Sequence, residues 1–228
     1  MTARAVDKAT LVRAAEEVRF LLGRGYARDD ALEMACRRHR LPFAQKEMLR
    51  RGVLDPAVAA SRRRKLIGPA DLRGEVVGVD GHNVIITLAS ALAGGPLVRA
   101  DDGVIRDTAR GAAGFRLGEA EMRALELAGE GLRAAGAGTA VFHLDAPVSH
   151  SARLAELIRR RLEAWGLAGD ALVEADPDLP LAVHPGPAAS SDGALIDACA
   201  RPVDLAGWII AREGLDGHVL DLHPAASA

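Results

Sequence analysis

Residues 75–88, with the sequence EVVGVDGHNVIITL, constrain the fold more than any other stretch of this chain. A run of valines stops at Asp80, and a second apolar run begins at Val84 after Gly-His-Asn. This pattern predicts a buried strand, a tight turn and a helix. In open α/β sheets, ligands bind beyond the carboxyl ends of the strands, so Asp80 is the first candidate site residue. Alternatively, Asp80 or Asn83 only caps the helix that follows.

Three later apolar runs also close on an acidic residue. The segments 139–144, 171–175 and 188–191 read as strands, and they are followed by these three aspartates: Asp145, Asp176 and Asp192. Helical patterns at 119–135 and 151–165 separate them, which predicts parallel βαβ units in a doubly wound α/β sheet. A further strand is expected at 218–222.

Parallel strands bring their carboxyl ends to one edge of a sheet, where like-charged carboxylates repel unless a cation compensates them. Clustered oxygen ligands suit Mg2+ or Mn2+, so the strand-end aspartates form a candidate metal site. Asp107 and Asp197 are possible additional ligands. Asp107 closes a hairpin predicted at 96–107 by the Asp-Gly pair. The Gly-rich segment 111–114 after it is either a loop that admits a substrate phosphate or a plain connection.

The first 70 residues have a different character. Apolar residues at helical spacing predict a helix from about Leu11 to Leu22 with Asp7 as its cap, a second that ends at His39, and a third over 44–51. Helix, short turn and helix is the arrangement of many DNA-binding proteins, and also of modules that bind no nucleic acid. We place a domain boundary near residue 70, giving a basic helical module over 1–70 and an α/β domain over 71–228.

Charge divides the chain in the same place. Residues 1–70 contain 16 Lys and Arg against 8 Asp and Glu, whereas the rest contains 13 against 23. A basic module suggests contact with a polyanion, and the alternative is an ordinary solvated face. The candidate nucleic-acid-binding residues are all basic: Arg37, Arg38, Arg40, Lys46, Arg50, Arg51, Arg62, Arg63, Arg64 and Lys65.

Composition excludes some functions. The 228 residues include 49% hydrophobic residues, enough for a sizeable core, but no run long enough for a membrane span and no signal-peptide pattern. The two cysteines, Cys36 and Cys199, suggest neither a disulfide framework nor a zinc site, and a cytoplasmic location is expected. Aromatic residues make up 3%, which argues against base-stacking platforms.

The motifs VVGVDGHNVI and SSDGALID resemble the first strand and a later Ser-x-Asp strand end of PIN-like nucleases, especially their NYN branch. The likeness runs from about Glu75 to His223. The whole chain also resembles an uncharacterised prokaryotic family, of the domain of unknown function 434 type, in which a helical module precedes such a domain. The resemblance implies a Rossmann-like three-layer fold, Asp80, Asp145 and Asp192 as ligands of a divalent ion, and Asn83 and Ser191 as orienting groups.

One position departs from the nuclease pattern, because Ala194 stands where a second acid often follows the Asp of the later strand; Asp197 is the candidate substitute. We therefore expect a metal-dependent phosphodiesterase that acts on nucleic acid, with RNA favoured over DNA as its substrate. We expect no membrane partner, and a homodimer is compatible with the sequence. The alternatives are a non-catalytic nucleic-acid-binding or regulatory protein with a decayed site, and a small-molecule phosphohydrolase.

Overall fold

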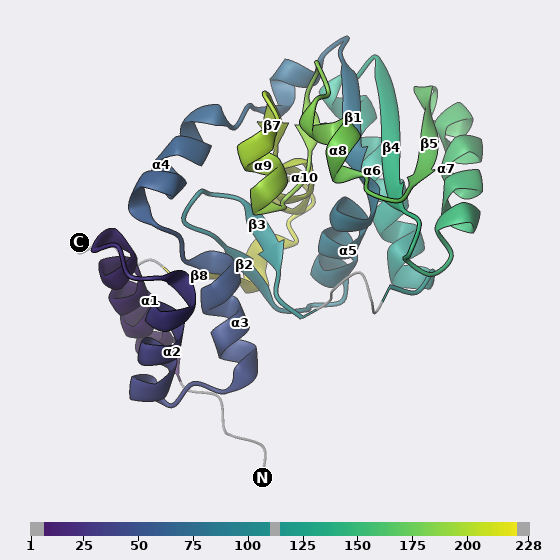
Figure 1. Cartoon of the computed structure of the whole chain (residues 1–228). Coiled ribbons are helices and arrows are strands. Elements are labelled where there is room, and N and C mark those ends of the chain that lie inside the picture. Colours follow the sequence, from purple (N-terminus) through teal and green to yellow (C-terminus); the bar gives the residue numbers. More distant parts are fainter. Residues whose placement is uncertain (1–6, 110–114, 223–228) are drawn as a thin grey trace. The chain divides into compact units, whose positions relative to one another are not determined.

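The computed structural model describes residues 7–109 and 115–222. The chain folds into two compact units, each of which is made of segments that are separated in the sequence (Figure 1). The first unit contains Met1–Arg64, Pro96–Ala109 and Val219–Ala228, and the second contains Lys65–Gly95 and Arg110–His218. No described helix is both long enough and apolar enough to cross a bilayer.

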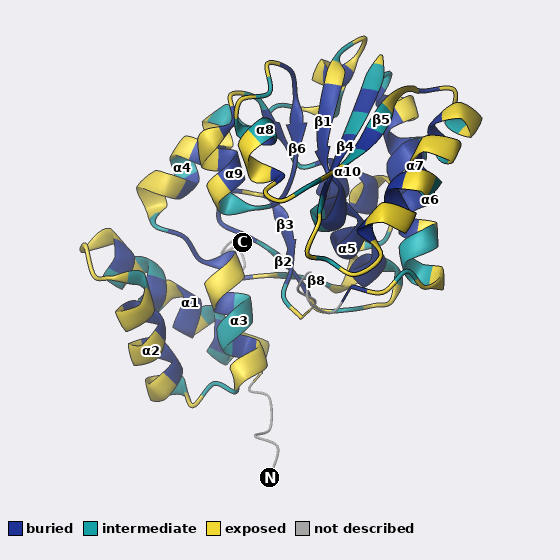
Figure 2. Ribbon diagram, turned by 45° about the vertical axis from the view of Figure 1, so that its right-hand side comes forward, coloured by how far each residue is buried: buried dark blue, intermediate teal, exposed yellow. Residues whose placement is uncertain are grey.

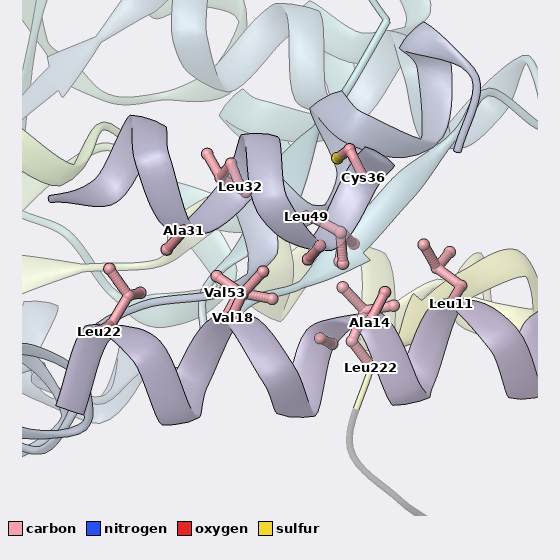
Figure 3. Close-up of a cluster of buried hydrophobic side chains, with 13 residues drawn as sticks. Leu11, Ala14, Val18, Leu22, Ala31, Leu32, Cys36, Leu49, Val53 and Leu222 are labelled. Atoms are coloured by element: carbon pink, nitrogen blue, oxygen red, sulfur yellow. The ribbon is translucent and has the colours of Figure 1, made fainter. Parts of the chain in front are cut away.

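The first unit begins with the four helices α1 (Lys8–Gly23), α2 (Arg28–His39), α3 (Phe43–Gly52) and α4 (Pro56–Lys65), the last of which ends at the change of unit. Three of them were predicted, and Asp7 caps α1 as expected, with its Oδ1 accepting a hydrogen bond from the Thr10 backbone N–H at 2.8 Å. The inward faces of α1, α2 and α3 share one core, which includes Val18, Leu32 and Leu49 (Figure 3).

A three-stranded sheet completes this core. The strands β2 (Leu97–Arg99) and β3 (Ile105–Asp107) form the predicted antiparallel hairpin, and β8 (Val219–Asp221) pairs with β2 in parallel. Val98 and Leu222 lie in the same apolar cluster as the helices. The strand expected near residue 220 therefore forms, but in this small sheet and not beside the strand of residues 76–80, because its partner is β2.

The second unit is built on a five-stranded parallel sheet in the order β5-β4-β1-β6-β7. Its strands are β1 (Val76–Asp80), β4 (Thr139–Asp145), β5 (Ala168–Glu174), β6 (Ala188–Ala189) and β7 (Pro202–Val203). The predicted strands at 139, 171 and 188 are thus present. Two have different ends: β5 starts earlier and stops before Asp176, and β6 is only two residues long.

Helices cover both faces of this sheet. They are α5 (Gly81–Leu92), α6 (Glu119–Ala135), α7 (Ser151–Trp165), α8 (Asp178–Ala182), α9 (Gly193–Ala198) and α10 (Leu205–Arg212), with 3-10 turns at Pro69–Leu72 and Asp216–His218. Helix α5 is almost completely buried, as its continuous apolar sequence requires (Figure 2). The structure therefore confirms a helical N-terminal region followed by a mostly parallel, Rossmann-like three-layer α/β fold.

The five-stranded sheet has one switch point, where the chain changes the direction in which it adds successive strands. From β1 the chain moves outward to β4 and β5, and then it returns to β6 and β7 on the other side of β1. Right-handed crossovers put α5, α6 and α7 on one face of the sheet and α8 and α9 on the other. Helix α10, which follows the last strand, returns to the first face and packs against α5 and α6. The carboxyl ends of β1 and β6 flank this switch point, which is where ligands bind in sheets of this kind.

Candidate functional site

Asp80 ends β1 and its carboxyl group is buried at the switch point. It caps α5, because Oδ1 accepts a hydrogen bond from the Asn83 backbone N–H at 3.3 Å. The other oxygen, Oδ2, accepts a hydrogen bond from Ser190 Oγ at 2.7 Å, across the gap between β1 and β6. Asp80 therefore does cap the helix that follows it, but capping uses only one of its two carboxylate oxygens.

Asn83 and Ser191 make a second connection across the same gap. Asn83 Oδ1 accepts hydrogen bonds from the Ser191 backbone N–H at 2.8 Å and from Ser191 Oγ at 2.9 Å. Both were expected to orient groups around the site, and the structure brings them together. Their bond fixes the start of α5 against the end of β6, so they hold the backbone on both sides of Asp80.

Asp192 follows β6 and caps α9. Its Oδ1 accepts hydrogen bonds from the backbone N–H groups of Ala194 at 2.8 Å and Leu195 at 3.1 Å. Its own N–H donates to Ser190 Oγ at 3.0 Å. Asp192 is therefore positioned by the same serine that binds Asp80, and its Oδ2 makes none of these capping bonds.

Asp145 ends β4, the strand next to β1. Its Oδ2 lies 3.0 Å from Nδ1 of His82, the second residue of α5, and the imidazole is buried with its edge against Phe115. Burial lowers the pKa of His82, while the hydrogen bond and charge of Asp145 oppose that shift. The contact holds the half-buried Asp145 beside the switch point.

These carboxylates influence one another. Burial raises the pKa of Asp80 to about 7, and the charges of Asp178 and Asp145 add to this effect while hydrogen bonds from Ser190 and Asn83 oppose it. The pKa of Asp178 is also raised, by burial and then by the charges of Asp192, Asp176 and Asp145. The site is therefore a group of mutually repelling acids, in which no Lys or Arg of the described ranges forms an ion pair with Asp80 or Asp178.

Asp178 and Ser190 were missed by the sequence analysis. Asp178 is the first residue of α8, and that helix lies against β1, with Leu181 filling the space above Gly78. A second acid in Asp176-Pro-Asp178 was the only available signal. Ser190 precedes the predicted Ser191, and only the register of β6 beside β1 shows which of the two hydroxyls reaches Asp80.

The donor chemistry fits a hard divalent cation, since every candidate ligand is a carboxylate oxygen. The geometry restricts how such an ion is held: no three Asp, Glu, His or Cys side chains of the described part are gathered closely enough to bind one together. Mg2+ commonly keeps several waters and uses only one or two carboxylates. A hydrated ion held chiefly by Asp80 therefore fits the residues present, and a fully protein-ligated ion does not.

Comparison with known proteins places this site within a family. Residues 69–208, more than half of the chain, match the family described as Domain of unknown function (DUF5616). The chain belongs to this family. Residues 10–65 match a second family, Protein of unknown function (DUF434), which agrees with the resemblance noted for the helical module.

A curated relative is the Uncharacterized protein MJ0935 of Methanocaldococcus jannaschii, which is 29% identical over 161 residues, covering 71% of this chain and 77% of that protein. No solved structure matches the chain significantly. Asp80 and Asp192, the two aspartates that border the switch point, both lie within the DUF5616 segment.

The two further aspartates proposed as ligands lie elsewhere. Asp107 also lies within the DUF5616 match, but it is buried at the end of β3 in the three-stranded sheet of the first unit, so it is not part of the sheet edge that carries Asp80. Asp197 lies within the DUF5616 segment but is exposed on α9, and its charge raises the pKa of Cys199 and not that of Asp80 or Asp178. The structure thus does not bring Asp197 into the acidic group, and Asp107 belongs to a different sheet from Asp80. Residues 110–114 of the Gly-rich segment lie outside the described residues.

The basic residues of the DUF434 segment fall into two groups. Arg62 is buried and forms an ion pair with Asp102 at 3.4 Å, and Arg63 donates a hydrogen bond to the Asp101 carbonyl. Lys65 donates to the carbonyls of Ile196 and Asp197, at the last turn of α9, at 2.8 and 2.6 Å. The prediction that these three bind nucleic acid is therefore corrected for Arg62, whose burial and ion pair give it a structural role, while Arg63 and Lys65 already bind carbonyls.

The second group is at the surface. Four members form ion pairs with acids of α1, α2 and α3: Arg37 and Lys46 with Glu33, Arg38 with Glu17, and Arg50 with Glu47. The other three, Arg40, Arg51 and Arg64, are exposed, and within the described residues no carboxylate pairs with them. These three are the basic side chains best able to meet a phosphate.

Proposed function

We propose that this protein is a metal-dependent phosphodiesterase that cleaves nucleic acid in the cytoplasm, with RNA as its main substrate. We further propose that the α/β unit is PIN-like, of the NYN branch. One observation carries this proposal: a buried aspartate at the switch point, Asp80, has its pKa raised to about 7 by burial and by neighbouring acids. A carboxylate in this environment is stabilised by a bound proton or by a metal ion beside it.

Each side chain of the site has a role in this proposal. A bound Mg2+ or Mn2+ would neutralise charge on a scissile phosphate and acidify a water. Asp80 would bind the ion, with Asp145 and Asp192 binding it through water, and Asp178 adds to the negative potential that attracts it. Ser190 orients Asp80 through its 2.7 Å hydrogen bond, and the Asn83–Ser191 hydrogen bonds fix the start of α5 against the end of β6. The exposed Arg40, Arg51 and Arg64 supply attraction for a polyanion.

A non-catalytic nucleic-acid-binding protein is the second candidate, and two observations favour it. Ala194 occupies the place of the second acid, and Asp192 uses one oxygen to cap α9. Asp197, the candidate replacement for this acid, does not join the acidic group.

The test combines two readouts on the full-length protein. Mn2+ or Mg2+ is expected to raise the melting temperature of the wild type, since binding to the native state stabilises it. Asp80→Asn and Asp192→Asn should reduce that rise, whereas the matched control Asp197→Asn should retain it. Cleavage of single-stranded RNA, structured RNA and DNA with Mn2+ should be lost in Asp80→Ala and retained in Asp197→Ala.

The two readouts separate the candidates. Metal stabilisation without cleavage of any substrate would favour the binding protein. Cleavage that persists in Asp80→Ala would identify a contaminating nuclease. Absence of any metal effect on the wild type would contradict the metal site itself.

A further inference from the structure

The outer side of the α1–α2 pair carries a groove, independent of the acidic site. It has a volume of about 920 Å3 and is lined only by residues of these two helices. Phe20 and Leu21 of α1 and Met34 and Ala35 of α2 form its apolar part. Val18 of α1 and Leu32 of α2 face the core of the unit (Figure 3), and Ala35 lines both the core and the groove. Phe20 and Met34 lie on the solvent-facing side of the two helices.

Two large apolar side chains of this groove are poorly covered. Phe20 is 59% exposed and Met34 is 52% exposed, and the Arg24 guanidinium lies over the Phe20 ring, 4.8 Å from its centroid. Single exposed apolar residues are ordinary on protein surfaces, but two that flank one groove on adjacent helices form a patch. Burying such a patch requires a complementary apolar surface.

The charges on the same groove indicate what that surface is. Arg13 and Glu16 both line it, one turn apart on α1, and within the described residues neither forms an ion pair. Arg13 donates a hydrogen bond to Thr10 Oγ1 only. An interface with two-fold symmetry uses the same patch from both partners, so it needs charges of both signs on that patch. Unpaired charges of opposite sign, one turn apart beside an apolar stripe, satisfy this requirement.

We infer that this groove binds a second copy of the same chain, with α1 of one copy packed against α1 of the other in antiparallel fashion. The interface covers Phe20 and Met34 of each copy, and Arg13 of one copy pairs with Glu16 of the other. Two helical hairpins joined in this way form a four-helix bundle, an arrangement stabilised by apolar side chains between helices.

Analytical ultracentrifugation of the full-length protein over a wide concentration range tests the inference. The wild type should show a reversible monomer–dimer equilibrium. Phe20→Glu and Met34→Glu should each weaken association by about ten-fold or more, because each puts a charge into the apolar part of the interface. Phe43→Glu is the matched control, since Phe43 is 78% exposed on α3 and does not line the groove, and it should leave association unchanged.

A charge exchange tests the arrangement of the helices. Arg13→Glu and Glu16→Arg should each weaken the dimer, and the double variant should associate more strongly than either. Failure of the double variant to recover would overturn the antiparallel pairing. A wild type that stays monomeric throughout would overturn the dimer, and if RNA affinity then fell in Phe20→Glu and Met34→Glu alone, the groove would be a nucleic-acid surface.

Discussion

Ser190 Oγ lies 2.7 Å from Asp80 Oδ2, so a hydroxyl at the end of β6 holds the carboxylate at the end of β1. The same hydroxyl accepts a hydrogen bond from the Asp192 N–H at 3.0 Å. One side chain thus positions both aspartates that border the switch point.

Replacing this serine tests its positioning role. Ser190→Ala removes a hydrogen bond that favours the ionised form of Asp80, so the pKa of Asp80 should rise further. The apparent affinity for Mn2+ at pH 7 should fall, by about 10–100-fold if Ser190 acts as an outer-shell partner. The pH at which Mn2+ begins to stabilise the protein should also move upward.

Ser149→Ala is the matched control for this experiment, because Ser149 is exposed in the loop before α7. Thermal shift titrations at pH 6, 7 and 8 measure both quantities. Unchanged Mn2+ affinity and unchanged pH dependence in Ser190→Ala would show that the serine has only a structural role.

Asp80 also makes the stability of the second unit depend on pH. Its folded pKa of about 7 lies above the ordinary value of 3.8, so between these values the folded state binds more protons than the unfolded state. Stability from this group is therefore fully present below about pH 4 and is lost as pH rises through 7. The loss is on the order of 4 kcal/mol, from 1.36 kcal/mol per pKa unit.

In Asp80→Asn this part of the pH dependence should disappear, and at pH 8 without metal the variant should be more stable than the wild type. Urea unfolding followed by tryptophan fluorescence measures it, because both tryptophans, Trp165 and Trp208, lie in the second unit. Asp216→Asn, an exposed change in the same unit, serves as the control. A wild type whose urea midpoint stays level from pH 5 to 8 would refute the raised pKa.

A buried ionic cluster is expected to stabilise the first unit. Asp102 accepts hydrogen bonds from Arg106 at 2.8 and 2.7 Å and pairs with Arg62 at 3.4 Å. Burial opposes ionisation of Asp102, but the hydrogen bonds and charge of Arg106 outweigh it and lower the pKa of Asp102. Arg106→Gln leaves this carboxylate poorly compensated and should destabilise the unit by about 3–5 kcal/mol.

Hydrogen exchange read by mass spectrometry locates this effect. Peptides from α1 to α3 should lose protection in Arg106→Gln and, to a smaller extent, in Arg62→Gln, whereas peptides from β4 and β5 should not change. Arg64→Gln, an exposed change, should behave as wild type. Equal loss of protection in both units would instead indicate that the chain unfolds as one body.

The three unpaired arginines make a prediction about nucleic acid. If Arg40, Arg51 and Arg64 bind phosphates, replacing all three by Gln should weaken RNA binding and reduce its dependence on salt. The slope of log K against log salt should fall by roughly 0.7 for each phosphate of single-stranded RNA that is no longer neutralised. Fluorescence anisotropy at several salt concentrations gives both values.

The control is an equal loss of charge in the second unit, namely the exposed residues Arg133, Arg153 and Arg160, all changed to Gln. If both triple variants lose affinity equally, the attraction is a property of net charge and not of the DUF434 segment. Deletion of residues 1–70 is a poor alternative, because Val98 and Leu222 would lose the core that they share with the helices.

Much of the fold could be predicted because its signals are local. The valine run before Asp80, the Asp-Gly hairpin and the helical spacing from Leu11 to Leu22 each depend on neighbours in sequence. The partner of β8 could not be predicted, because it depends on which distant strand is free to pair. Arg62 was placed at the surface for a similar reason, since Asp102, which neutralises it, is 40 positions away.

The candidate site shows the same division. Asp80, Asp145 and Asp192 were predicted from strand ends, and parallel pairing does bring them to one edge of the sheet. Asp178 reaches the group only because α8 crosses the sheet beside β1, which no local pattern indicates. Asp197 shows the opposite case. Its spacing in the sequence suits a ligand, but its side chain is exposed to solvent on α9.

The interrupted first unit has a consequence for how the protein is made. Helices α1 to α3 are synthesised first, but their core also includes Val98 of β2 and Leu222, next to β8. During translation the apolar side chains that contact Val98 and Leu222 stay uncovered until the whole α/β unit has left the ribosome. Long-range closure of this kind is slow and leaves such surfaces open to aggregation. A nascent chain stalled before residue 219 should therefore hold a folded second unit beside an incomplete first one, and the helical region should be the part that chaperones bind.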